Sequence, residues 1–98
     1  MQKFSFTSKA IEDLDEIWDY TLVNWSEKQA ELYYSLIIES CKKIASNPKL
    51  GKSYAIVKPK LLGYLCEQHI LFYHVISKNE IVIIRILHGM MDLKNKLN

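Results

Sequence analysis

The chain is poor in the residues that cross-link or interrupt a fold. Its 98 residues include two cysteines, two prolines and three glycines. Cys41 and Cys66 are too few and too far apart for a disulfide framework or a paired-cysteine metal site, so we expect two reduced thiols. No apolar run approaches the roughly 20 residues of a membrane-spanning helix, and the N-terminus lacks the apolar stretch of a secretion signal. We therefore expect one cytoplasmic domain, residues 1–98, with no membrane contact.

Acidic residues are missing from one long segment. From Lys42 to Lys60 the sequence has six lysines and no aspartate or glutamate. Residues 1–40 carry eight acids and three lysines, a net charge of −5, whereas residues 41–98 carry ten cations and three acids, a net charge of +7. This asymmetry indicates a surface for an acidic partner, protein or nucleic acid, although a solvated lysine-rich loop explains it equally well.

The first half of the chain has the period of two amphipathic helices. Thr7 or Ser8 is suited to cap a helix whose apolar positions recur every three or four residues as far as residue 24. Ser26 and Gln29 have the spacing of a capping box, which predicts a second helix that ends before Pro48. The short connection predicts an antiparallel helical hairpin. The face of the first helix opposite its apolar stripe is acidic: Glu12, Asp13, Asp15, Glu16 and Asp19.

The second half is rich in β-branched and aromatic residues. Three strands are predicted at 62–67, 69–76 and 81–88, with a weakly alternating strand at 3–6 and residues 52–60 as a loop. The predicted fold class is α+β, with an N-terminal strand and a helical hairpin packed on a small antiparallel β-sheet, in the order β-α-α-β-β-β.

The last predicted strand raises two further expectations. Its side chains are apolar on both faces, and the helices can cover only one of them. We therefore expect an obligatory partner on the other face. Strict alternation also places Arg85 and His88 on opposite faces, where they cannot meet at one phosphate. In the middle strand, His69 and Tyr73 share a face and His74 points the other way.

Four segments together resemble one family. They read DLDEIWDYTLVNWSEKQAELYYSLI (13–37), NPKLGK (47–52), CEQHILFY (66–73) and RILHGMMDL (85–93). Their combination is similar to the ParE branch of the RelE/ParE toxin family, the plasmid-stabilisation toxins, and the similarity spans nearly the whole chain. It implies a bacterial toxin of a type II toxin–antitoxin system that inhibits DNA gyrase without catalysis of its own. It also implies neutralisation by a ParD-like antitoxin, with DNA contacted only through the antitoxin complex.

The resemblance implies two sets of site residues. The end of the last strand and the following tail are expected to dock on the target, through Arg85, His88, Met90, Met91, Asp92, Leu93, Lys94, Lys96 and Leu97. The antitoxin is expected along the helical hairpin and the sheet edge, where the candidate contacts are Trp18, Trp25, Tyr33, Tyr34 and Ile37.

Two other functions remain open at this point. Relatives of the RelE type cut ribosome-bound messenger RNA, which needs a cationic phosphate site and an acid or base; Tyr73, Arg85 and His88 are the candidates. Leu62 and His74 stand where many family members have arginine. A member without toxicity that only binds its antitoxin would explain these departures. The histidine spacing offers no metal site, and no cofactor is expected.

Overall fold

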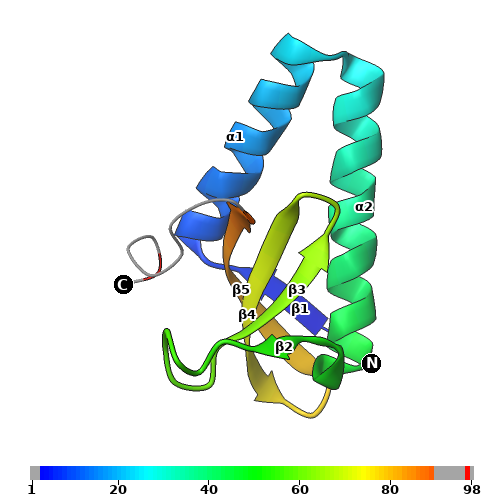
Figure 1. Ribbon diagram of the computed structural model, residues 1–98. Coiled ribbons are helices and arrows are strands. Elements are labelled where there is room, and N and C mark those ends of the chain that lie inside the picture. Colours follow the sequence, from blue (N-terminus) through cyan, green and yellow to red (C-terminus); the bar gives the residue numbers. More distant parts are fainter. Residues whose placement is uncertain (1–2, 90–96, 98) are drawn as a thin grey trace.

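The computed structural model describes residues 3–89 and 97, and its elements follow the predicted order (Figure 1). β1 (Lys3–Phe6) leads into α1 (Ser8–Asn24) and α2 (Glu27–Ser46). A short 3-10 helix, η1 (Pro48–Leu50), and the two-residue strand β2 (Lys52–Ser53) come next. The chain then forms β3 (Leu62–Cys66), β4 (His69–Ser77) and β5 (Glu80–His88). The predicted fold class is confirmed.

Local hydrogen bonds set the start of each helix where the sequence indicates. Thr7 caps α1, since its Oγ1 accepts a hydrogen bond from the backbone N–H of Ala10 at 3.1 Å. Ser26 caps α2 in the same way, with the N–H of Gln29 as donor at 3.1 Å. Two residues separate the helices, so they fold back as the predicted hairpin (Figure 1).

The five strands form one mixed sheet in the order β1-β5-β4-β3-β2. β5, β4, β3 and β2 are successively antiparallel, whereas β1 pairs with β5 in parallel. Two details of the prediction are therefore corrected: one pairing is parallel, and the expected loop 52–60 begins with the edge strand β2. β1 is parallel because the whole hairpin lies between it and β5 in the sequence, which leaves room for a crossover.

Beyond the end of β1, Thr7 and α1 supply hydrogen-bond partners for the edge of β5. The N–H of Thr7 donates to the carbonyl of Ile83 at 3.0 Å, and its hydroxyl donates to the carbonyl of Ile84 at 2.9 Å. One turn further on, the carboxylate of Asp13 accepts a hydrogen bond from the N–H of Ile86 at 2.9 Å. Side chains from the start of α1 thus satisfy the β5 backbone that no strand covers.

The main core lies between the hairpin and one face of the sheet. Ala10, Leu14, Ile37, Cys41 and Ile44 from the helices meet Leu71, Tyr73, Ile81, Ile83 and Ile86 from the strands. Both cysteines are free and buried, as expected, and burial raises the pKa of the Cys41 thiol to about 12. Not every position of the predicted stripe on α1 is buried. Ile11 and Trp25 are exposed, and Trp25 lies at the end of the helix beyond the sheet.

A second apolar cluster covers the opposite face of the sheet. It is built from Leu61, Ile70, Phe72, Leu87 and Leu97, with Tyr54 and Val57 packed against it. The chain's own 54–61 loop and Leu97 therefore cover part of the face for which we expected an obligatory partner, whereas Leu65 on the same face is 65% exposed. The expectation is corrected in one respect: residues 54–61 are not a loop without packing, and they supply part of the cover themselves. No helix within residues 3–89 is both long and apolar enough to cross a membrane.

Candidate interaction groove

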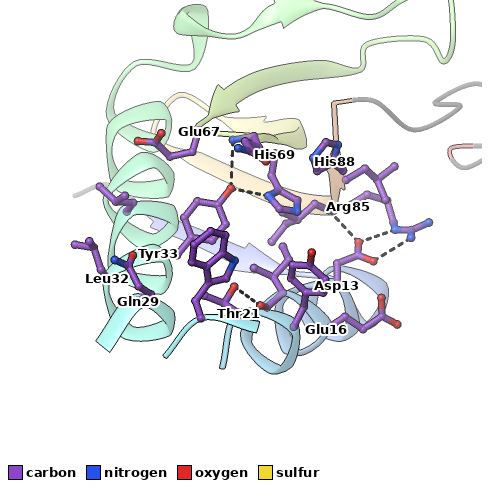
Figure 2. Close-up of a pocket in the computed structure, with 17 residues that line it drawn as sticks. Asp13, Glu16, Thr21, Gln29, Leu32, Tyr33, Glu67, His69, Arg85 and His88 are labelled. Carbon is purple, nitrogen blue, oxygen red and sulfur yellow. Dashed lines mark hydrogen bonds and ion pairs between the residues drawn. The ribbon is translucent and has the colours of Figure 1, made fainter. Parts of the chain in front are cut away.

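A groove of about 1010 Å³ lies between the hairpin and the end of the sheet (Figure 2). α1 and α2 form two of its walls, and the turn between β3 and β4 and the end of β5 form the third. Its lining residues are Asp13, Glu16, Ile17, Tyr20, Thr21, Trp25, Gln29, Leu32, Tyr33, Leu36, Glu67, Gln68, His69, Arg85, Ile86, Leu87 and His88.

The helical walls of the groove are apolar and unusually exposed. Trp25 is 73% exposed, Tyr20 65% and Leu32 54%, and Leu36 is also accessible to solvent. Single exposed apolar side chains are common, but four that line one groove mark a contact surface. They are exposed because the hairpin extends past the sheet, away from the strands that cover the rest of its inner side (Figure 1).

One end of the groove contains a partly buried ion pair. The Arg85 guanidinium donates through Nε to Asp13 Oδ2 at 2.7 Å and through Nη2 to Asp13 Oδ1 at 3.0 Å. Asp13 is only 7% exposed and also accepts from the backbone N–H of Ile86. The hydrogen bonds to Asp13 raise the pKa of Arg85. This ion pair holds α1 against β5, and it directs two N–H groups of the Arg85 guanidinium toward Asp13 (Figure 2).

The sheet wall of the groove carries a polar cluster around His69. The Tyr33 hydroxyl lies 2.6 Å from His69 Nδ1, and it accepts a hydrogen bond from the backbone N–H of Gln68 at 3.3 Å. His88 pairs with His69 across β4 and β5, and the two ring centroids are 5.4 Å apart. Burial, and then the neighbouring His88, lower the pKa of His69 to about 4. His69 is therefore uncharged at neutral pH.

Residues 4–93 match the family described as the ParE toxin of the type II toxin–antitoxin system parDE. The chain belongs to the ParE toxin family. It is 33% identical over 84 residues to Toxin ParE1 of Mycobacterium tuberculosis (strain ATCC 25618 / H37Rv), covering 86% of each chain. It is 29% identical over 97 residues to Toxin ParE1 of Caulobacter vibrioides, covering 99% of each.

A solved structure is similar as well. The structure described as the chromosomal ParDE TA system from P. aeruginosa superposes with a TM-score of 0.75 at 26% identity, covering 90% of this chain and 96% of that one. The protein is thus a ParE-type toxin of a type II toxin–antitoxin system, with an antitoxin as partner.

The three residues proposed for RNA cleavage in this ParE-type chain are not all brought together. Arg85 and His88 both line the groove, although they leave β5 on opposite faces of the sheet, as predicted: Arg85 pairs with Phe72 and His88 with His69, three positions further along the ladder. The register shifts between Phe72 and Tyr73, which inserts an extra residue at Ile84, but this bulge comes before Arg85 and does not change the alternation from Arg85 to His88. Arg85 reaches the groove through its contact with Asp13 of α1. Tyr73, however, is fully buried in the main core, where its hydroxyl donates to the carbonyl of Pro48 at 2.7 Å.

The candidate antitoxin contacts fall into three places. Trp25 and Tyr33 line the groove. Trp18 and Tyr34 pack edge to face, with centroids 6.1 Å apart, at a second hollow on another side of the hairpin. Ile37 is 0% exposed in the main core, so this candidate is corrected to a packing residue.

The candidate target-docking residues are only partly described. Arg85 and His88 lie in the groove. Leu97 is 6% exposed and belongs to the second apolar cluster, so its assignment as an exposed docking residue is corrected. The other six, Met90, Met91, Asp92, Leu93, Lys94 and Lys96, lie outside the described residues.

Sequence reasoning missed two features of the groove. Asp13 was assigned to the solvent-exposed acidic face of α1, but it is buried beside Arg85. Asp13 and Arg85 are 72 residues apart, and no local pattern links them. The contact between Tyr33 and His69 was also missed, although both residues had been considered separately. Among residues 3–89 and 97, no three His, Cys, Asp or Glu side chains are grouped as metal ligands.

Proposed function

We propose that this toxin inhibits DNA gyrase by binding rather than by hydrolysis, and that a ParD-like antitoxin neutralises it by occupying the groove. Membership of the ParE toxin family carries the first part of the proposal. The same membership favours action in the cytoplasm, where gyrase works.

The groove supports the position of the antitoxin. A partner segment that inserts apolar side chains between α1 and α2 would cover Tyr20, Trp25 and Leu32, which the chain itself leaves exposed. Large aromatic residues in such hollows carry much of the binding energy of protein interfaces. The polar groups at the edges of the groove, Glu16 and Glu67 among them, would form the rim of the interface.

The arrangement of the polar residues favours binding over RNA cleavage. Phosphodiester cleavage needs positive charge aimed at the phosphate and an acid or base beside it. Here two donor groups of Arg85 are occupied by Asp13, and Tyr73 is held in the core by Pro48. The two residues therefore offer no shared phosphate site in this conformation.

Gyrase inhibition is tested with purified toxin, gyrase, ATP and supercoiled plasmid. We expect linear plasmid to accumulate after denaturation, because the toxin traps the cleaved enzyme–DNA state. Arg85→Ala should leave the transcripts of expressing cells intact, as wild type does. Toxin-dependent shortening of transcripts, with no linear plasmid, would assign the chain to the RNA-cleaving relatives. Normal growth of cells that express the folded chain alone would assign it to the non-toxic class.

Antitoxin binding is tested with a matched pair of tryptophans on one helical hairpin. Trp25→Ala should weaken binding of the co-encoded antitoxin by about 30-fold or more, as expected for a central aromatic contact. Trp18→Ala removes the same side chain from the other side of the hairpin and should change the Kd much less. Calorimetric titration gives both values. A larger effect at Trp18 would move the antitoxin from the groove to the second hollow.

A further inference from the structure

Six exposed lysines lie at the end of the molecule opposite the α1–α2 connection. Lys42 and Lys43 are near the end of α2, Lys49 is in η1, and Lys52 is in β2. Lys58 and Lys60 belong to the loop between β2 and β3. Figure 1 shows α2 ending beside η1 and β2 at the lower right of the view, and the loop between β2 and β3 at the lower left. We call this set, Lys42, Lys43, Lys49, Lys52, Lys58 and Lys60, the lysine end.

The lysine end has little negative charge to offset it. No acid occurs between Lys42 and Lys60. Among the described residues, Lys42 of the lysine end forms an ion pair with Glu39 at 3.4 Å, and both side chains are largely exposed. Such a pair contributes little. Lys58 is close enough to the sheet to act on His74, whose pKa is lowered by burial first and by Lys58 second.

The backbone beneath the lysines is fixed. The Tyr73 hydroxyl anchors η1 through the carbonyl of Pro48. The loop closes on itself, because the N–H of Tyr54 donates to the carbonyl of Leu61 at 2.8 Å, and the Tyr54 ring packs on Phe72 with centroids 5.0 Å apart. Lys58 and Lys60 are therefore held on a rigid support, which reduces the entropy lost when they bind a partner.

We propose that the lysine end contacts the phosphate backbone of duplex DNA without reading its sequence. Lysine is depleted from the centre of protein–protein interfaces, whereas it serves as a point-charge partner for phosphate. DNA presents about one charge per 1.7 Å of its axis, so lysines spread over several elements all find a partner. The inference does not depend on gyrase inhibition. It replaces the expectation that DNA is contacted only through the antitoxin complex.

An anionic membrane surface is the competing partner, because Ile56 is 97% exposed in the same loop and could enter lipid. DNA is favoured because the lysines extend over α2, η1 and β2 as well as this loop. The measurement must therefore compare both partners.

Two double variants with the same change in charge test the proposal. Lys52→Gln/Lys58→Gln removes two cations of the lysine end. Lys9→Gln/Lys28→Gln removes two exposed lysines from α1 and α2 outside it. Binding of the full-length toxin to a labelled duplex of about 20 base pairs is followed by fluorescence anisotropy at about 50 to 200 mM salt, without gyrase or antitoxin.

The outcomes separate cleanly. We expect the first double variant to bind the duplex at least about tenfold more weakly at the lowest salt. The plot of log association constant against log salt should also become less steep, by about two in the magnitude of its slope. The control pair should lower the slope by less than about one half. Equal effects of the two pairs would overturn the proposal, as would no binding at 50 mM salt. Tighter binding to vesicles of anionic lipid, or to polyglutamate, would overturn it in favour of that partner. Because gyrase is absent, none of these results depends on the proposed function.

Discussion

Asp13 shows how much one side chain does in this small domain. Its carboxylate accepts two hydrogen bonds from Arg85 and one from the backbone of Ile86. It thereby fixes α1 to β5 at the point where β1 no longer covers the strand. The residue lies on the wall of the groove, so it also sets the shape of the surface that a partner would meet.

We predict that Asp13→Ala lowers the free energy of unfolding by about 3 kcal/mol, near the lower end expected for breaking a buried ion pair. Arg85 would lose its partner, and the N–H of Ile86 would lose its acceptor. Urea unfolding monitored by circular dichroism measures the change. Asp19→Ala removes an exposed acid from the same helix and should cost less than about 0.5 kcal/mol. Equal costs would show that the pair contributes nothing.

A second prediction concerns the dependence of the unfolding free energy on pH, through His69. The pKa of His69 is about 4 in the folded chain, below its ordinary value of 6.5, so the unfolded chain binds more protons between these values. His69 therefore contributes to the free energy of unfolding above pH 6.5, and this contribution is lost as the pH falls toward 4. His69→Gln should reduce the fall in unfolding free energy over this window. The groups facing His69 are His88, Asp13 and Tyr33.

The His69 titration itself can be followed by NMR. We expect the ring resonance to shift with a midpoint near pH 4. A midpoint near 6.5, with the same pH dependence of stability in wild type and His69→Gln, would show that the ring is solvated and that the groove wall is open.

The residues of the groove illustrate what a sequence pattern cannot supply. Arg85 and Asp13 belong to segments whose local patterns are both ordinary, and only the crossing of α1 over the end of β5 brings them together. A charged residue on an amphipathic helix is read as solvent-exposed unless its distant partner is known. The aromatic candidates of the hairpin were identified, but their division between two surfaces depends on where the sheet ends.

At the scale of single elements, the sequence was a better guide. Both helix caps and the order of the elements follow from local chemistry, which does not depend on the rest of the fold. The β-bulge at Ile84 in β5, by contrast, could not be predicted from local chemistry. Residues 81–84 are all apolar, so one inserted residue leaves no trace in the pattern. The bulge nevertheless moves every side chain after it to the other face, including those of Ile86 and Leu87.

We expect removal of the two helix caps to lower the free energy of unfolding by different amounts. Thr7 caps α1 and also donates to the carbonyl of Ile84, whereas Ser26 only caps α2 at the exposed connection. Thr7→Ala should therefore destabilise the protein by about 2 kcal/mol, one part from the cap and one from the lost hydrogen bond. Ser26→Ala should cost about 1 kcal/mol. Thr7→Ser keeps the hydroxyl and should cost less than either. If the two alanine variants are equal, the link to β5 has no energetic role.

For the molecule as a whole, the main surprise is that the chain covers part of the second face of its own sheet. The pattern of β5 correctly indicated two apolar faces. The cover for the second face comes from short apolar stretches in a loop and from Leu97, none of which has a helical or strand period. The proposed antitoxin-binding surface therefore moves from the sheet face to the groove, where Tyr20, Trp25 and Leu32 are exposed.

This arrangement can be tested with two leucines. Leu97→Ala should lower the free energy of unfolding by about 2 kcal/mol, the lower end for a buried leucine, because the second cluster is small. Leu65→Ala changes the same side chain at a position 65% exposed on β3 and should have almost no effect. Urea unfolding and binding of gyrase are measured for both. An unchanged stability with lost gyrase binding would return Leu97 to the docking surface. A loss of stability, with gyrase binding retained below the unfolding transition, would establish that Leu97 holds the second face of the sheet closed.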